Sequence, residues 1–195
     1  MTTNQETIRE YLGDLIAVLN HVSTAVSTQA KDDGLMRIPH ASHVIQSTSD
    51  VLLRQRTALE AHVKSLGGVT TGGGLKDVLT TVAGALAGLY GKARGETASR
   101  MLRDDYTALS FVSICTTMLH TTALALQDSA VAALTRQHMA DYPPLIMAIS
   151  ELVPDAVVAD LAADKALIAN ANAAEQAGAN LKESWRHASS ESAVR

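Results

Sequence analysis

The most constraining feature of this chain is an unbroken aliphatic stripe near its N-terminus. At the spacing of one helix face the chain carries only aliphatic side chains. They are Ile8, Leu12, Leu15, Leu19, Val22 and Val26. Helical bundles that bind metals place Glu and Glu-x-x-His side chains on such inward faces. A stripe without a carboxylate therefore predicts a hydrocarbon core and argues against a metal enzyme.

Local signals predict where the helices of the first half begin and end. Thr3 and Glu6 have the spacing of a capping box, so we expect a helix from there to about residue 30. Pro39 is predicted to be the first residue of a second long helix, because its missing N–H costs nothing at that position. The Gly67–Gly68 pair is predicted to end this helix.

The second half of the chain continues the helical pattern. We expect a short helix over residues 75–92 and a long one over residues 97–126. Asp128 or Ser129 can cap a further helix. The Pro143–Pro144 pair is predicted to kink or break that helix near Tyr142, because proline removes backbone donors and pushes the preceding residue away from helical geometry.

These elements predict an all-α protein with one main domain. Residues 1–153 form the expected bundle. Pro154 is predicted to restart the chain into a C-terminal helical extension over residues 154–188, helical to about Trp185. The Ser-rich end, residues 189–195, is expected to be a disordered tail.

Composition narrows the class of function. Aromatic residues make up only 3% of the chain, so small aliphatic side chains must fill the core. The net charge is -4 and no block of Lys or Arg occurs, which argues against nucleic-acid binding. The single thiol, Cys115, lies in an apolar run, as in proteins of a reducing compartment. The polar N-terminus lacks a signal-peptide pattern, and the small-apolar stretch 78–90 is too short to span a bilayer, so we expect a cytoplasmic protein without a membrane partner.

A few acid and histidine pairs could bind a metal. His40 and His43 are three residues apart, a spacing that places two imidazoles on one helix face. His138 and Asp141 have the same spacing, although a hydrogen bond between them beside the expected kink explains the pair as well.

Other candidates have simpler explanations. The adjacent pair Asp104 and Asp105 points in two directions and is expected to face solvent or a helix cap. Asp14 and His21 flank the aliphatic stripe of the first helix. His62 has part of the environment of a phosphoacceptor histidine, but Lys64 lies two residues after it rather than three, which favours a solvated histidine near a helix end.

Several segments resemble bacterial ferritin-like proteins, most closely the small stress-associated families of the YciF type. The matching segments are residues 12–19, 59–68, 102–109 and 118–126, and the order of helices is also similar over about residues 5–153. The resemblance implies a ferritin-like four-helix bundle with an additional short helix and a C-terminal helical extension. It also implies a di-iron centre between the helices.

The chain departs from this family at the implied ligand positions. A family Glu falls at Leu19, and a Glu-x-x-His unit falls near Leu52 and Gln55. A second such unit falls among Ala108, Ser110 and Phe111, and the last helix offers only Asp141. An unpaired buried carboxylate costs several kcal/mol, so aliphatic residues at these positions would stabilise a bundle without metal.

The leading hypothesis is thus a metal-free ferritin-like protein with a structural or protein-interaction role, forming a homodimer through small-residue helix faces. The alternative is an iron- or manganese-binding oxidase or iron-handling protein with unusual ligands. Those ligands would come from Asp14, His21, Asp104, Asp105, His120, His138 and Asp141. A third hypothesis, phosphotransfer at His62, requires that side chain to be exposed in mid-helix beside Lys64.

Overall fold

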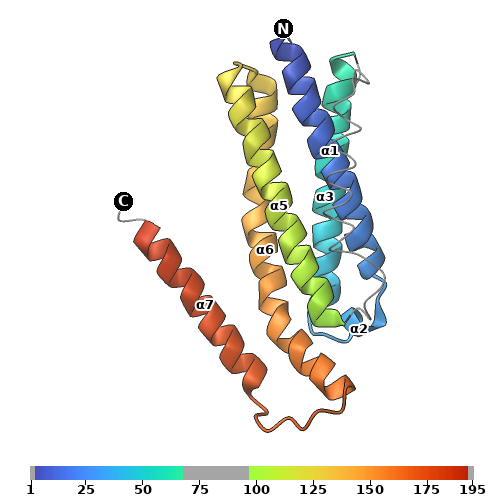
Figure 1. Ribbon diagram of the computed structural model, residues 1–195, viewed down its shortest axis with the longest axis vertical. Helices are drawn as coiled ribbons and strands as arrows, with labels where there is room; N and C mark the ends of the chain where they lie inside the picture. The colour runs from blue at the N-terminus through green and yellow to red at the C-terminus, as the bar shows by residue number, and fades with distance from the viewer. Residues whose placement is uncertain (1–2, 68–96, 193–195) are drawn as a thin grey trace.

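The computed structural model describes residues 3–67 and 97–192, and within these ranges the chain forms six helices and no strand (Figure 1). α1 packs against α3 and α5, and α6 packs against α5 and α3. Their facing sides form one apolar core. The described part is therefore all-α, as predicted. The short helix expected over residues 75–92 lies outside the described residues.

The first helix, α1 (Asn4–Gln29), confirms the capping box and the aliphatic stripe. The backbone N–H of Thr3 donates to Glu6 Oε2 at 2.6 Å, and the backbone N–H of Glu6 donates to Thr3 Oγ1 at 3.2 Å. All members of the stripe are buried, with at most 2% of any side chain exposed. The stripe therefore faces the core along the whole helix.

The connection to the next long helix differs from the prediction. A short helix, α2 (Asp33–Met36), is capped by the Asp32 side chain. The long helix α3 (Ala41–Ser65) begins after His40, which has a left-handed backbone at φ 65°, so Pro39 is not its first residue. Leu35 and Ile38 are buried, so the connection packs against the core. Gly67, at φ 91°, follows the end of α3 as predicted.

α5 (Ala98–Ala125) and α6 (Ser129–Ala163) form an antiparallel pair (Figure 1). Asp128 caps α6 as predicted, accepting from the backbone N–H of Val131 at 3.0 Å. The other end of α6 caps α5, because Asp160 accepts from the N–H groups of Ala98 and Ser99 at 3.1 and 3.0 Å. Burial raises the pKa of Asp160, but these hydrogen bonds outweigh burial and leave the pKa below its ordinary value.

Of the kink or break expected near Tyr142, a break is wrong, because α6 is one helix through Pro143, Pro144 and Pro154. Pro143 and Pro144 are exposed, while Tyr142 between α5 and α3 is fully buried. The two prolines thus remove backbone hydrogen bonds only on the solvent side of the helix. Packing of the buried side of α6 outweighs that loss.

The C-terminal region also differs from the expected single helical segment after Pro154. α6 continues past Pro154 to Ala163, and the exposed connection 164–172 then leads to α7 (Ala173–Ser192). The helix includes Ser189–Ser192, at the start of the expected tail. In Figure 1, α7 lies beside α6 and outside the group of α1, α3, α5 and α6, and Lys182 forms an ion pair with Glu151 at 3.2 Å.

Candidate functional site

The centre of the bundle contains a buried polar layer contributed by three helices. Gln55 of α3, Thr116 of α5 and Tyr142 of α6 each have 0% of their surface exposed. The Tyr142 hydroxyl donates to Gln55 Oε1 at 2.7 Å and lies 3.0 Å from Thr116 Oγ1. The Tyr142 proton goes to Gln55, and Thr116 Oγ1 also lies 2.9 Å from the backbone carbonyl of Val112, so the Thr116 proton is shared between that carbonyl and the Tyr142 oxygen. Buried polar groups of this kind are tolerated because they are paired.

The polar layer continues from Gln55 toward the surface of the bundle. The Gln55 amide donates to Asp141 Oδ2 at 2.9 Å and to the backbone carbonyl of His138 at 3.3 Å. Arg54 also donates to Asp141 Oδ2, at 3.0 Å. The Gln55 side chain therefore has partners for its oxygen and for its amide group. We call Gln55, Thr116, Tyr142 and Asp141 the core polar layer.

The buried end of this layer, Gln55, Thr116 and Tyr142, consists of neutral groups. Burial raises the pKa of Tyr142 well above its ordinary value, so the hydroxyl stays protonated and acts as a donor. Amide and neutral hydroxyl groups are weak ligands for iron compared with carboxylate and imidazole. The buried end of the layer, Gln55, Thr116 and Tyr142, thus provides hydrogen bonds between helices and no strong metal ligand, and its one carboxylate, Asp141, is held by Arg54 and Gln55.

His138 lies next to the core polar layer. The hydrogen bond expected between His138 and Asp141 does not form. Asp141 instead accepts from Arg54 and Gln55 of the facing helix. The His138 side chain is only 4% exposed, and its Nδ1 has no hydrogen-bond partner among the described residues. Burial lowers the pKa of His138; Asp141 raises it and Arg54 lowers it further.

The lowered pKa of His138 predicts a loss of stability in acid. Below the ordinary pKa of 6.5, His138 is protonated in the unfolded chain but stays neutral in the folded protein. Lowering the pH therefore favours the unfolded state, until the pH reaches the lower pKa that His138 has in the folded protein. The free energy of unfolding should therefore fall by up to ~1.4 kcal/mol per pH unit in this window, relative to the His138→Gln variant.

Urea titrations from pH 7.5 downward measure this difference in slope. The exposed His43 provides the matched control, and His43→Gln should keep the wild-type slope. Identical slopes for wild type and His138→Gln would contradict the prediction.

The adjacent acids of α5 are buried, which corrects the expectation that they face solvent or a helix cap. Asp105 is 0% exposed and Asp104 is 7% exposed. With its amide nitrogen turned toward Asp105, Gln29 of α1 donates to both carboxylate oxygens, at 2.7 and 2.6 Å. Arg103 pairs with Asp104 at 2.7 Å. The close approach of the end of α1 to the start of α5 accounts for this burial.

The remaining candidate ligands lie in separate environments. Asp14 is half-buried, and its pKa is raised by burial and by Glu10. His21 is half-buried on α1, and His120 Nδ1 lies 2.9 Å from the Thr135 hydroxyl. Among the residues that the structure describes, no three His, Cys, Asp or Glu side chains come close enough to hold a metal ion. The candidate residues are thus not brought together there.

The positions of His40, His43 and His62 bear on two further hypotheses, a metal-binding histidine pair and a phosphoacceptor histidine. His40 and His43 are both exposed at the start of α3. His62 lies in the last turn of α3, half-buried and with Nε2 shielded from solvent. It therefore does not have the exposed mid-helix position that phosphotransfer requires.

The sequence analysis missed the core polar layer as a unit. Gln55 was noted only as an amide at a position where the ferritin-like pattern has a ligand, and Tyr142 only as the residue before a proline pair. The available signal was the helical spacing of Gln55 with Leu52 and Leu59, which are both fully buried. That spacing places a polar side chain on the inward face of α3.

The comparisons with known proteins give no match: no family model, no curated protein and no solved structure matches this chain. The demonstrated fold is therefore an all-α arrangement of packed helices.

Proposed function

We propose that this protein is a metal-free helical bundle, ferritin-like in scaffold, with a structural or protein-interaction role in the cytoplasm. The observation that carries the proposal is the core polar layer. Gln55 stands where the ferritin-like pattern places a metal ligand, and its amide is fully used in hydrogen bonds to Tyr142, Asp141 and the backbone of His138.

The energetics of the layer support a structural role. Each buried polar group that is paired across two helices contributes about 0.5–1.5 kcal/mol, whereas an unpaired one costs about 1–3 kcal/mol. The contacts of Gln55 and Tyr142 form only when α3, α5 and α6 adopt this arrangement. The layer therefore favours one alignment of the helices over others that would leave these groups unpaired.

Elemental analysis of protein produced in medium containing iron and manganese, and purified without chelator, tests the proposal. We expect well under one iron or manganese ion per chain after dialysis. Near-stoichiometric, tightly held iron or manganese would overturn it and favour the alternative of a metal-binding oxidase. In that event the His138→Gln variant, which removes the most buried imidazole, shows whether His138 is a ligand.

A further inference from the structure

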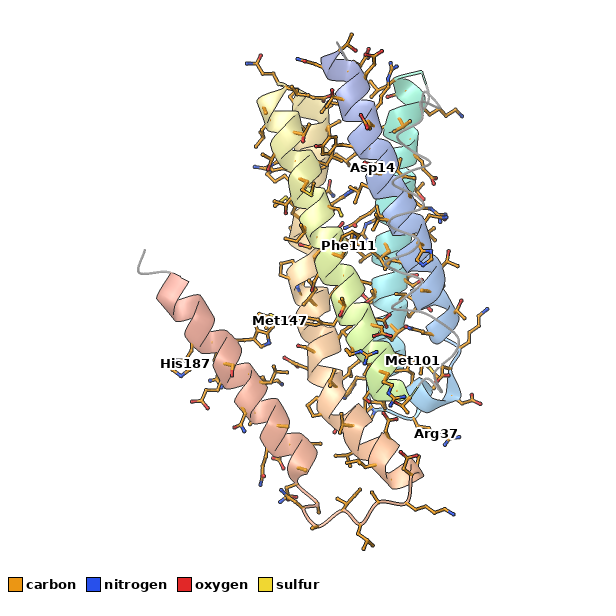
Figure 2. The ribbon with its side chains drawn as sticks, in the orientation of Figure 1. Asp14, Arg37, Met101, Phe111, Met147 and His187 are labelled. Atoms are coloured by element: carbon orange, nitrogen blue, oxygen red, sulfur yellow. The ribbon has the colours of Figure 1, made fainter. Side chains whose placement is uncertain are left out.

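The outer face of α5 is apolar and exposed, which is unusual because the inner face of the same helix also packs in the core. Phe111, Ile114 and Met118 are 38%, 60% and 52% exposed. Ile114 and Met118, together with Tyr11 of α1, border a shallow groove between the two helices, lined also by Thr117 and Leu126. Figure 2 shows Phe111 on α5 and Asp14 on the neighbouring α1. We call Phe111, Ile114, Met118 and Tyr11 the α5 face.

The α5 part of this face lacks charged residues. No Asp, Glu, Lys or Arg occurs between Tyr106 and Gln127. Four hydroxyls along this part of α5 donate to carbonyl groups one turn earlier in their own helix, at 2.8–2.9 Å. These residues are Ser110, Thr117, Thr121 and Thr122. An apolar partner could therefore cover these four residues without leaving their hydroxyl donors unpaired.

A helix that is apolar on all sides is normally buried on all sides. By length and composition α5 is the one helix in the described part of the chain that could cross a membrane, yet only 33% of its most apolar window is buried. Its inner face already packs on α1 and α6, so a partner is needed only on the outside.

We propose that the α5 face binds a second copy of this chain, with the two α5 helices antiparallel about a two-fold axis near Ile114. A two-fold interface must be self-complementary, and a centre without charges brings no like charges together. Antiparallel packing also sets the N-terminal end of each α5 dipole beside the C-terminal end of the other. The proposal rests on the interaction role proposed above and names its partner and surface.

The charges at the two ends of the α5 face complement each other in this arrangement. Arg100 and Arg103 are exposed at the start of α5. Glu6 and Glu10 are exposed on α1 at the opposite end, where α1 begins beside the end of α5 (Figure 1). An antiparallel copy places the basic end of one chain beside the acidic end of the other. A lipid surface would instead bring Glu6 and Glu10 against apolar chains or anionic headgroups.

Sedimentation equilibrium of the full chain tests the interface. We expect a dimer for the wild type and, for the Ile114→Glu/Met118→Glu variant, a dissociation constant raised at least ~30-fold, as for central interface residues. Leu53→Glu, at a 47% exposed position on α3, is the matched control and should remain dimeric. Far-UV circular dichroism should show unchanged helicity in both variants.

Cross-linking tests the two-fold geometry independently of affinity. In a Cys115→Ser background, Ile114→Cys should form a covalent dimer under mild oxidation, because residues near a two-fold axis face their own copies within disulfide reach. Leu53→Cys in the same background should not.

Three results would overturn the proposal: a monomeric wild type at roughly 100 µM, a dimer that survives the double Glu substitution, or equal cross-linking at residues 114 and 53. Sedimentation of monomeric wild type with phosphatidylglycerol vesicles would assign the face to lipid instead. Metal content separates this proposal from the previous one, since a dimer with stoichiometric iron would overturn the metal-free role and leave the interface intact.

Discussion

Leu19→Ala is expected to lower the free energy of unfolding by about 2–5 kcal/mol, the largest single effect predicted for this protein. Leu19 is 0% exposed in the aliphatic stripe of α1 and belongs to the core that α1 shares with α3 and α5. Truncation removes buried methyl groups and leaves a cavity that rigid helix backbones fill only in part. The stripe that predicts the bundle should therefore also be the main source of its stability.

Urea unfolding followed by circular dichroism measures the effect of Leu19→Ala. Leu53→Ala is the control with the same chemical change at a 47% exposed position, and it should shift the free energy by no more than about 0.5 kcal/mol. Equal effects at the two positions would show that Leu19 does not occupy a packed core.

Gln55→Leu is expected to cost about 1–3 kcal/mol, although leucine is the more hydrophobic residue. The substitution removes the 2.7 Å acceptor of the buried Tyr142 hydroxyl and leaves Thr116 Oγ1, at 3.0 Å, as the remaining partner of that hydroxyl. Asp141 loses the Gln55 amide as a donor, but it is partly exposed and keeps Arg54. The cost is therefore the loss of two hydrogen bonds of about 0.5–1.5 kcal/mol each, and it falls mainly on the Tyr142 hydroxyl.

A double-mutant cycle with Tyr142→Phe isolates that cost. Gln55→Leu/Tyr142→Phe removes both partners of the 2.7 Å hydrogen bond, and Thr116 can still donate to the Val112 carbonyl at 2.9 Å. The double variant should thus be destabilised by clearly less than the sum of the two single variants. Additive losses in urea unfolding would mean that Gln55 and Tyr142 contribute independently and that the layer is not a unit.

The features predicted correctly are those set by residues near one another in the sequence. The Thr3–Glu6 capping box, the Asp128 cap and the turn at Gly67 each depend on groups within a few positions along the chain. The buried faces of the helices follow from apolar spacing in the same way. Such signals act within one or two helical turns, so they can be recognised in the sequence without knowing which helices pack together.

Apart from the helix boundaries expected at Pro39 and Pro154, the incorrect predictions concern contacts between distant segments. Tyr142 stays helical before two prolines because α3 and α5 hold its side chain, and Asp105 is buried because Gln29 of α1 reaches it. Asp141 bonds to Arg54 and Gln55 rather than to His138 for the same reason. Thr116 lies 26 residues from Tyr142 along the chain, and the other partners lie more than seventy residues away.

The sequence by itself determined that this protein is a set of amphipathic helices with a hydrocarbon core, because apolar spacing and helix caps are local properties. The tertiary structure alone decided which polar side chains share that core and which apolar side chains remain outside it. Gln55 and Tyr142 meet inside, and Ile114 and Met118 stay exposed, only because of how the helices are paired. Hydrogen bonding and burial depend on which atoms are close in space, and helix packing sets those distances.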